Sequence, residues 1–284
     1  MEAYLSARQP DFIIHCAAER RPDVVEKDPE GSEAINVTVP THLAQWSALQ
    51  EKVPLLINIS TDYVFDGSKP PYGVDDEPNP LNAYGVSKLR GERAVRDHGK
   101  QGKAINLRVP VLYGRVETPD ESAVNVLTTT IRRPSTPPAQ LKKMDAFAVR
   151  YPTYVGDIAR ALHDLVELHN KESAGPKELP PTLHFSAMEA MTKYDMCNLM
   201  ARVWNSAYAQ VATEEEQEKQ FDGRGIATAE YLDPEYEVDP AAATSRPRHC
   251  KLDLTEIKQL GISTECVSFE EWWKQYLLEV SWPK

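Results

Sequence analysis

The first half of the chain alternates between short apolar runs and longer amphipathic stretches. Residues 12–18, 55–59 and 104–114 are short, apolar and bounded by polar residues, which is typical of buried strands. Residues 36–49 and 83–98 instead place apolar side chains at helical spacing. Strands and helices that alternate in this order form parallel sheets. The sequence therefore predicts an α/β fold with a parallel sheet in this half.

The pattern loosens after Gly114 but still indicates regular elements. We expect a strand at residues 183–186 and helices at residues 122–132, 158–168, 192–204, 255–260 and 268–279. Asp157 and Thr192 are placed to cap two of these helices, and Gly261 follows the shortest one at a C-cap position. Acidic, Gly-bearing and Pro-bearing residues at 213–243 show no sustained period, which predicts a long and mobile surface insertion.

Composition limits what the chain can do. Its 284 residues suffice for a sizeable core, and 41% apolar with 26% charged residues is ordinary for a globular protein. A net charge of −11 argues against nucleic-acid binding, because phosphates need a basic face. We expect no membrane span and no secretory signal, since no apolar run is long enough for either. The four cysteines lack metal or disulfide spacing, so we expect a reduced, cytoplasmic protein without a metal site.

The most informative chemical groups belong to Thr61, Tyr84 and Lys88. Thr61 follows the strand at residues 55–59, while Tyr84 and Lys88 lie one helical turn apart at the start of the next helix. An ammonium group beside a phenol is expected to lower the pKa of the phenol toward neutrality, and a hydroxyl can hold a carbonyl oxygen. Such a set can transfer a proton while a hydride moves elsewhere. The alternative is a surface tyrosine beside a solvated lysine, which the hydroxyl pair at the strand end makes less attractive.

A second candidate region follows the strand at residues 12–18. Cys16 and the two alanines after it would let a ligand approach the strand end, where open α/β sheets bind ligands. Arg20 or Arg21, in the charged loop beyond, could pair with a phosphate. On local sequence alone, a buried strand end and solvated arginines are the simpler explanation of these residues.

One expected unit is missing from the sequence. A dinucleotide-binding fold begins with a strand, a Gly-rich turn and a helix whose N-terminus holds the pyrophosphate. The first glycine of this sequence is Gly31, inside a charged loop. We therefore expect an N-terminally incomplete sheet. Either the chain is truncated, or it no longer binds a dinucleotide in the usual way.

Several segments carry a family resemblance. The run from Ser60 reads Ser-Thr-Asp-Tyr-Val-Phe-Asp-Gly, and the run from Tyr84 reads Tyr-Gly-Val-Ser-Lys-Leu-Arg-Gly-Glu. Both resemble the extended short-chain dehydrogenase/reductases, and within them the dTDP-4-dehydrorhamnose reductase branch. Residues 15–26, residues 191–196, and residues 246–248 with 252–253 resemble the regulatory beta subunits of methionine adenosyltransferase more closely.

The resemblance implies a Rossmann-like sheet with a Ser/Thr-Tyr-Lys triad and a cofactor site. The triad falls on Thr61, Tyr84 and Lys88, and we expect it to be retained without turnover. The cofactor of the family is NADP. The resemblance places the contacts of the cofactor on Cys16, Arg20, Tyr84, Lys88 and Leu112. The Gly-rich turn of the family has no counterpart here.

The resemblance also implies a function and a domain division. We expect residues 1–145 to form a truncated NAD(P)-binding Rossmann-like domain and residues 146–284 a smaller, substrate-binding-like region. The expected function is that of a non-catalytic regulatory subunit, which binds the catalytic subunit of methionine adenosyltransferase and modulates S-adenosylmethionine synthesis. An NADP-dependent sugar-nucleotide reductase of the dTDP-4-dehydrorhamnose reductase type is the alternative, as is an inactive truncated form of either.

Overall fold

The computed structural model describes residues 1–131, 138–171, 179–211, 227–237 and 244–279 of the chain. These residues belong to two compact units that interleave along the sequence. Unit 1 consists of Met1–Pro110, Ile158–Ser186 and Ala241–Thr264, and unit 2 consists of Val111–Asp157, Ala187–Pro240 and Glu265–Lys284. The division differs from the single boundary expected at residue 145. Its physical reason is that strand and helix segments from the second half of the chain complete the sheet layer of unit 1.

The centre of unit 1 is a parallel sheet, as the sequence predicted. Among the described residues it contains β1 (Phe12–His15), β2 (Leu55–Thr61), β3 (Ala104–Val109) and β7 (Thr182–His184), in the order β1-β2-β3-β7. All three pairings are parallel. Pro110 directly follows β3, which confirms that a residue without an amide hydrogen ends the ladder there.

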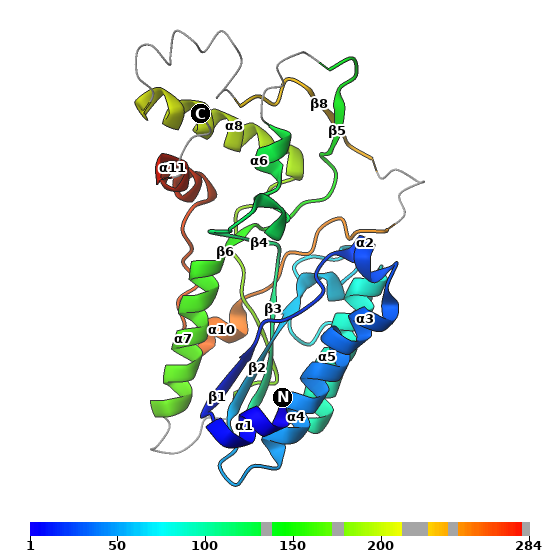
Figure 1. Ribbon diagram of the computed structural model, residues 1–284, viewed down its shortest axis with the longest axis vertical. Coiled ribbons are helices and arrows are strands. Elements are labelled where there is room, and N and C mark those ends of the chain that lie inside the picture. The colour runs from blue at the N-terminus through cyan, green and yellow to red at the C-terminus, as the bar shows by residue number, and fades with distance from the viewer. Residues whose placement is uncertain (132–137, 172–178, 212–226, 238–243, 280–284) are drawn as a thin grey trace. The chain divides into compact units, whose positions relative to one another are not determined.

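Helices cover the sheet of unit 1 (Figure 1). They are α1 (Glu2–Arg8), α2 (Pro22–Val25), α3 (Pro29–Glu33), the π-helical turn η1 (Ala34–Thr38), α4 (Val39–Ala48), the 3₁₀ turn η2 (Asp62–Val64), α5 (Ala83–His98), α10 (Thr255–Gln259) and residues 158–171 of α7 (Val155–Lys171). Leu43 and Trp46 of α4 and Val95 of α5 pack with Leu56 of β2 in one apolar cluster. The predicted helical stripes therefore point at the sheet, while α1, α2 and α3 were not predicted.

A buried ion pair ties α5 to the sheet. Arg108 of β3 and Glu92 of α5 lie 2.8 Å apart, and each side chain is only 5% exposed. The Arg108 guanidinium donates to both carboxylate oxygens of Glu92 and lies over the ring of Phe65. Because a buried charge without a partner is costly, this pair fixes how α5 lies on β3.

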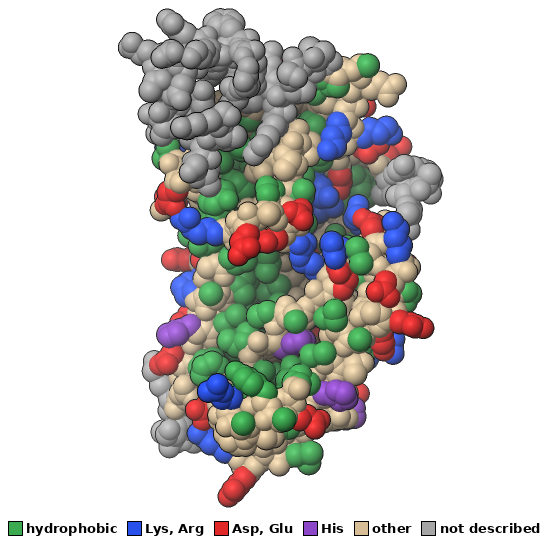
Figure 2. All heavy atoms as spheres, in the orientation of Figure 1, with side chains coloured by type: hydrophobic (Ala, Val, Ile, Leu, Met, Phe, Trp, Pro, Cys, Tyr) green, Lys and Arg blue, Asp and Glu red, His purple; other side chains and the backbone are tan. Residues whose placement is uncertain are grey.

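Strand β1 forms one edge of the sheet and leaves apolar surface uncovered. Phe12 and Ile14 are 46% and 36% exposed, although their register partners Leu55 and Ile57 on β2 are fully buried. Figure 2 shows apolar side chains gathered at this place on the surface. Parallel sheets normally bury both faces, so β1 behaves as an edge where the sheet is incomplete.

Unit 2 is built around aromatic side chains. Its described elements are β4 (Leu112–Tyr113), the 3₁₀ turn η3 (Pro119–Glu121), α6 (Leu127–Thr130), β5 (Lys142–Asp145), β6 (Thr153–Tyr154), α8 (Lys193–Val211), β8 (Leu232–Glu235) and α11 (Phe269–Glu279). Tyr113, Phe269, Trp272 and Trp273 pack together with Met196 and Met200 of α8 in the core of this unit. Both tryptophans are buried, at 8% and 0% exposure.

Unit 2 corrects three sequence predictions. Part of the expected insertion at residues 213–243 is regular, because β8 pairs in parallel with β5; residues 212–226 and 238–243 lie outside the described residues. The helix expected at 122–132 shrinks to α6, since Ser122 instead bonds the carbonyl of Leu112. Asp157 lies inside the first turn of α7 rather than capping it, because the helix starts at Val155 and the carboxylate accepts from the amide of Val267.

Other predicted caps are confirmed. The Thr192 hydroxyl accepts from the amide of Asp195, whose carboxylate in turn accepts from the amide of Thr192. Gly261 follows α10 with φ of +81°, the left-handed conformation that glycine adopts without steric cost. These ends could be predicted because the groups that make them are neighbours in sequence.

Replacing Glu92 by Leu leaves Arg108 charged and buried without its partner. We expect a loss of about 3–5 kcal/mol in unfolding free energy, and recovery of most of it in the double variant Glu92→Leu/Arg108→Met. Urea unfolding followed by circular dichroism measures both. The exposed pair Lys143–Glu235 is the control, and its disruption should cost less than about 1 kcal/mol. Strictly additive losses at Glu92 and Arg108 would contradict the role assigned to the pair.

Candidate functional site

The candidate site lies at the carboxyl ends of β1 and β2, beside the first turns of α5. Thr61 is the last residue of β2, Tyr84 is the second residue of α5, and Lys88 follows one turn later. Cys16 follows the last residue of β1 directly. Since parallel strands end at the same edge, the fold collects these residues from segments that are far apart in sequence.

The Thr61 hydroxyl lies close enough to the Tyr84 phenol to lower the pKa of that phenol. Thr61 is 6% exposed, and its hydroxyl oxygen also accepts from the amide of Tyr63, at 3.2 Å, at the start of the 3₁₀ turn η2. The rings of Tyr63 and Tyr84 meet edge to face, with centroids 5.9 Å apart. The Thr61 hydroxyl and the Tyr84 phenol are therefore neighbours at this end of β2.

The backbone around Tyr84 is set by two neighbours. Asn82 is the N-cap of α5, and its side-chain oxygen accepts from the amide of Gly85 at 2.9 Å. A Cβ atom at Gly85 would lie 2.3 Å from the carbonyl oxygen of Tyr63, so only glycine permits this approach of helix and turn. The Tyr-Gly pair in the motif thus has a steric reason.

The ammonium group of Lys88 is buried and points at the sheet. Its Nζ donates to the carbonyl oxygen of Ile59 on β2, at 2.8 Å, and the residue is 3% exposed. Burial lowers the pKa of Lys88 to about 8, and the nearby carboxylate of Glu92 opposes the change. Burial therefore makes the charged form of Lys88 less stable than it would be in water.

The expected effect of Lys88 on Tyr84 is not found. The pKa of the Tyr84 phenol is raised above its ordinary value, chiefly by burial, with the charge of Asp62 adding to the rise. The Thr61 hydroxyl and the charge of Arg20 act in the opposite direction. Burial is the physical reason for the rise, and Lys88, whose ammonium donates to the Ile59 carbonyl, is not among the main groups that oppose it.

His15 and Cys16 lie within electrostatic reach of Lys88. The pKa of His15 is lowered to about 4, first by burial and then by the Lys88 charge. Burial raises the pKa of the Cys16 thiol, against the influence of Lys88. The Nε2 atom of His15 is buried without a hydrogen-bond partner, which leaves His15 as a neutral wall of the site.

The remaining predicted residues separate into two groups. Arg20 lies near enough for its charge to lower the pKa of the Tyr84 phenol, so it belongs to the same cluster as Thr61, Lys88 and Cys16. Leu112 is part of β4 in unit 2. His184 is 1% exposed in β7 and contacts Arg108, which confirms that it is a packed strand residue.

Asn36 is a residue of this site that sequence reasoning missed. Its side-chain amide accepts from the Glu19 amide, donates to the Glu19 carbonyl, and donates to the Ser87 hydroxyl, at 2.9, 3.0 and 3.0 Å. It lies in the π-helical turn η1 and is 1% exposed. Such turns are rare and often mark functional sites. A buried asparagine inside an amphipathic helix pattern was the available signal.

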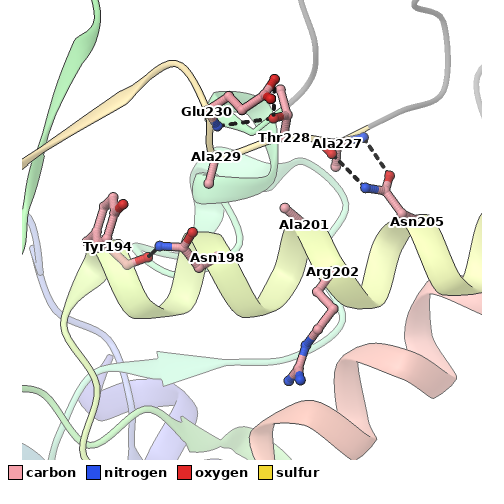
Figure 3. A pocket seen from close by; sticks show the side chains of 9 residues that line it. All are labelled: Tyr194, Asn198, Ala201, Arg202, Asn205, Ala227, Thr228, Ala229 and Glu230. Carbon is pink, nitrogen blue, oxygen red and sulfur yellow. Dashed lines mark hydrogen bonds between the residues drawn. The ribbon is translucent and has the colours of Figure 1, made fainter. Parts of the chain in front are cut away.

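A shallow pocket in unit 2 contains none of these residues. It lies between α8 and residues 227–230, as Figure 3 shows, and Asn205 closes one end by bonding the amide and the carbonyl of Ala227. Its charged side chains are already paired in part, since Arg202 bonds Glu270.

Within the described ranges, no group of His, Cys, Asp and Glu is arranged to hold a metal ion. Nor does any helix there have the length and apolarity needed to cross a membrane.

The sequence matches a known protein family. Residues 1–281 match the model of the RmlD substrate binding domain. The chain belongs to the RmlD substrate binding domain family. The α/β fold with its parallel sheet is the fold of this family, so the fold predicted from the sequence is confirmed.

Three relatives show how the similarity is distributed. Methionine adenosyltransferase 2 subunit beta of Danio rerio is 38% identical over 275 residues, which cover 97% of this chain and 73% of the relative. A dTDP-4-dehydrorhamnose reductase of Mycolicibacterium smegmatis is 36% identical over 159 residues, which cover 55% of this chain and 45% of the relative. The structure of dTDP-4-dehydrorhamnose reductase from Bacillus anthracis in complex with NADP has a TM-score of 0.70 and 22% identity, covering 98% of this chain and 83% of that chain.

The side chains present fit one part of a nicotinamide dinucleotide. Thr61 supplies a hydroxyl, Tyr84 a phenol and Lys88 a buried ammonium group at the end of β2 and the start of α5, and the neighbouring Ser60 hydroxyl is buried without a partner. Such groups suit the hydroxyls and the carboxamide of a nicotinamide riboside. No Gly-rich turn for the pyrophosphate precedes β1 in this sequence, where α1 lies instead.

The pKa of Lys88 predicts how stability depends on pH. Its folded pKa of about 8 lies below the ordinary value of 10.5, so between these values the unfolded chain binds a proton that the folded chain does not. Stability contributed by this group therefore rises with pH in that window. Relative to Lys88→Met, the unfolding free energy of the wild type should increase by roughly 1 kcal/mol per pH unit. Urea unfolding at several pH values measures this difference, and a constant difference would contradict it.

Proposed function

We propose that the chain is a non-catalytic, cytoplasmic regulatory subunit of methionine adenosyltransferase, which binds the catalytic subunit and modulates S-adenosylmethionine synthesis. The observation that carries the proposal is the extent of the similarity. At comparable identity, methionine adenosyltransferase 2 subunit beta matches 97% of the chain, whereas the reductase of Mycolicibacterium smegmatis matches 55%. The shared sequence with the beta subunit therefore runs through both compact units.

The geometry of the site supports binding rather than turnover. A reductase of this type needs Tyr84 to give up its proton readily. Here burial and Asp62 raise the pKa of the phenol, and the Lys88 ammonium is directed to the Ile59 carbonyl. Groups that hold a ligand without donating a proton to it suit a regulatory site.

The cofactor part of the proposal is an NADP site. Cys16, Arg20, Tyr84 and Lys88 of unit 1 would contact it, and the contact expected at Leu112 stays a prediction. In the reductase alternative, the bound cofactor would supply a hydride, Thr61 would orient the carbonyl acceptor and Tyr84 would supply the proton.

Association with the catalytic subunit tests the proposal. Mixed at micromolar concentrations, the two proteins should co-elute in gel filtration, and the KM or kcat of S-adenosylmethionine synthesis should change as the chain is added. The fold-matched control is the dTDP-4-dehydrorhamnose reductase of Mycolicibacterium smegmatis, which should do neither. Separate elution together with unchanged kinetics would refute the regulatory role.

The reductase alternative is supported by the intact Thr61–Tyr84 pair, and it has its own test. NADPH oxidation is followed at saturating dTDP-4-keto sugar with the wild type and with Tyr84→Phe. Our proposal predicts no substrate-dependent oxidation by either. Oxidation by the wild type that falls by about 10²-fold in Tyr84→Phe would establish Tyr84 as the proton donor and contradict a non-catalytic role.

A further inference from the structure

The first turn of α5, which carries Tyr84, is held by contacts that come from outside the helix. The first amides of a helix lack acceptors within it. The amide of Gly85 is satisfied by Asn82, the N-cap, at 2.9 Å. The amide of Ala83 instead donates to Oε1 of Glu26, also at 2.9 Å, across 57 positions in sequence. Ala83 immediately precedes Tyr84, so this long-range bond fixes the backbone from which the phenol projects.

Glu26 reaches Ala83 from an anchored segment. It follows α2 directly, and its neighbour Val25 is only 2% exposed. The start of the same segment is held by Asn36, whose amide bonds both backbone groups of Glu19. The carboxylate of Glu26 is thus presented by a fixed backbone rather than by a freely moving loop.

Two further bonds close a ring of three segments. The Asn82 amide donates to the carbonyl of Ser245 at 2.9 Å, and the next residue, Arg246, pairs with Asp23 of α2 at 3.1 Å. Residues 245 and 246 therefore bridge the start of α5 to α2, and the Glu26–Ala83 bond completes the circuit. A closed ring of contacts restrains its members more than separate pairs do, because no member can shift without breaking a bond.

We propose that Glu26 is a positioning residue that sets the first turn of α5, and with it the Thr61–Tyr84 pair, for binding a nicotinamide dinucleotide. The inference rests on the proposed NADP site and deepens it. Glu26 acts through the Ala83 amide and is not assigned a contact with the cofactor.

The test compares two carboxylates that make the same bond in different units. Glu189 accepts from the amide of Phe269, the first residue of α11 in unit 2, at 3.0 Å. Glu189→Ala therefore removes a matched helix-end acceptor in the other compact unit. Hydrogen exchange of peptides over residues 83–88 and NADPH affinity by calorimetry are measured on the full chain, below the melting temperature of every variant.

We expect Glu26→Ala to speed exchange in residues 83–88 and to weaken NADPH binding by about fivefold, the factor that matches loss of one capping acceptor. Glu26→Gln keeps an oxygen acceptor and should restore most of both properties, and Glu189→Ala should change neither. Equal effects from Glu26→Ala and Glu189→Ala, or wild-type behaviour of Glu26→Ala, would overturn the inference. If the wild type binds no NADPH, the cofactor proposal fails, and unchanged exchange in Glu26→Ala would then refute the positioning role on its own.

Discussion

The hydrogen bond from the Lys88 ammonium to the Ile59 carbonyl is the interaction on which the site depends. It places a buried cation against the end of β2, at 2.8 Å from a backbone oxygen. Glu92, one turn further along α5, keeps that charge tolerable and is itself neutralised by Arg108 on β3. The polar line from β2 through α5 to β3 therefore explains why α5 cannot shift along the sheet without leaving a charge unpaired.

This arrangement is suited to binding a ligand but not to transferring a proton to it. In a reactive Tyr-Lys pair, the ammonium group lowers the pKa of the phenol. Here burial raises the pKa of the Tyr84 phenol, and the Lys88 ammonium donates to a carbonyl of the sheet. Residues that look catalytic by spacing can thus act as a rigid wall for a ligand. That reading agrees with the proposed regulatory role, which needs a stable site and a partner-binding surface but no proton transfer.

The features that could be predicted from the sequence are those that residues close together in the chain determine. The parallel sheet, the helical faces of α4 and α5, the end of β3 at Pro110 and the Thr192 cap all follow from local pattern, and they are present. Tyr84 and Lys88 were placed on one helical face for the same reason. The direction of the Lys88 ammonium could not be predicted, because it depends on burial against β2. The contacts of Asn36, Glu26 and β8 are with segments distant in sequence. A local pattern of apolar and polar residues cannot predict such contacts.

The state of the Tyr84 phenol tests the account most directly. Tyrosine rings labelled with ¹³C allow each phenol to be titrated by NMR, and Tyr84→Phe identifies the signal of Tyr84. The account predicts that this signal stays in its protonated position beyond pH 10.0, the ordinary pKa of the group, because burial outweighs the lowering influence of Thr61 and Arg20. Titration of Tyr84 near neutral pH would show that Lys88 does activate the phenol, and it would contradict the account.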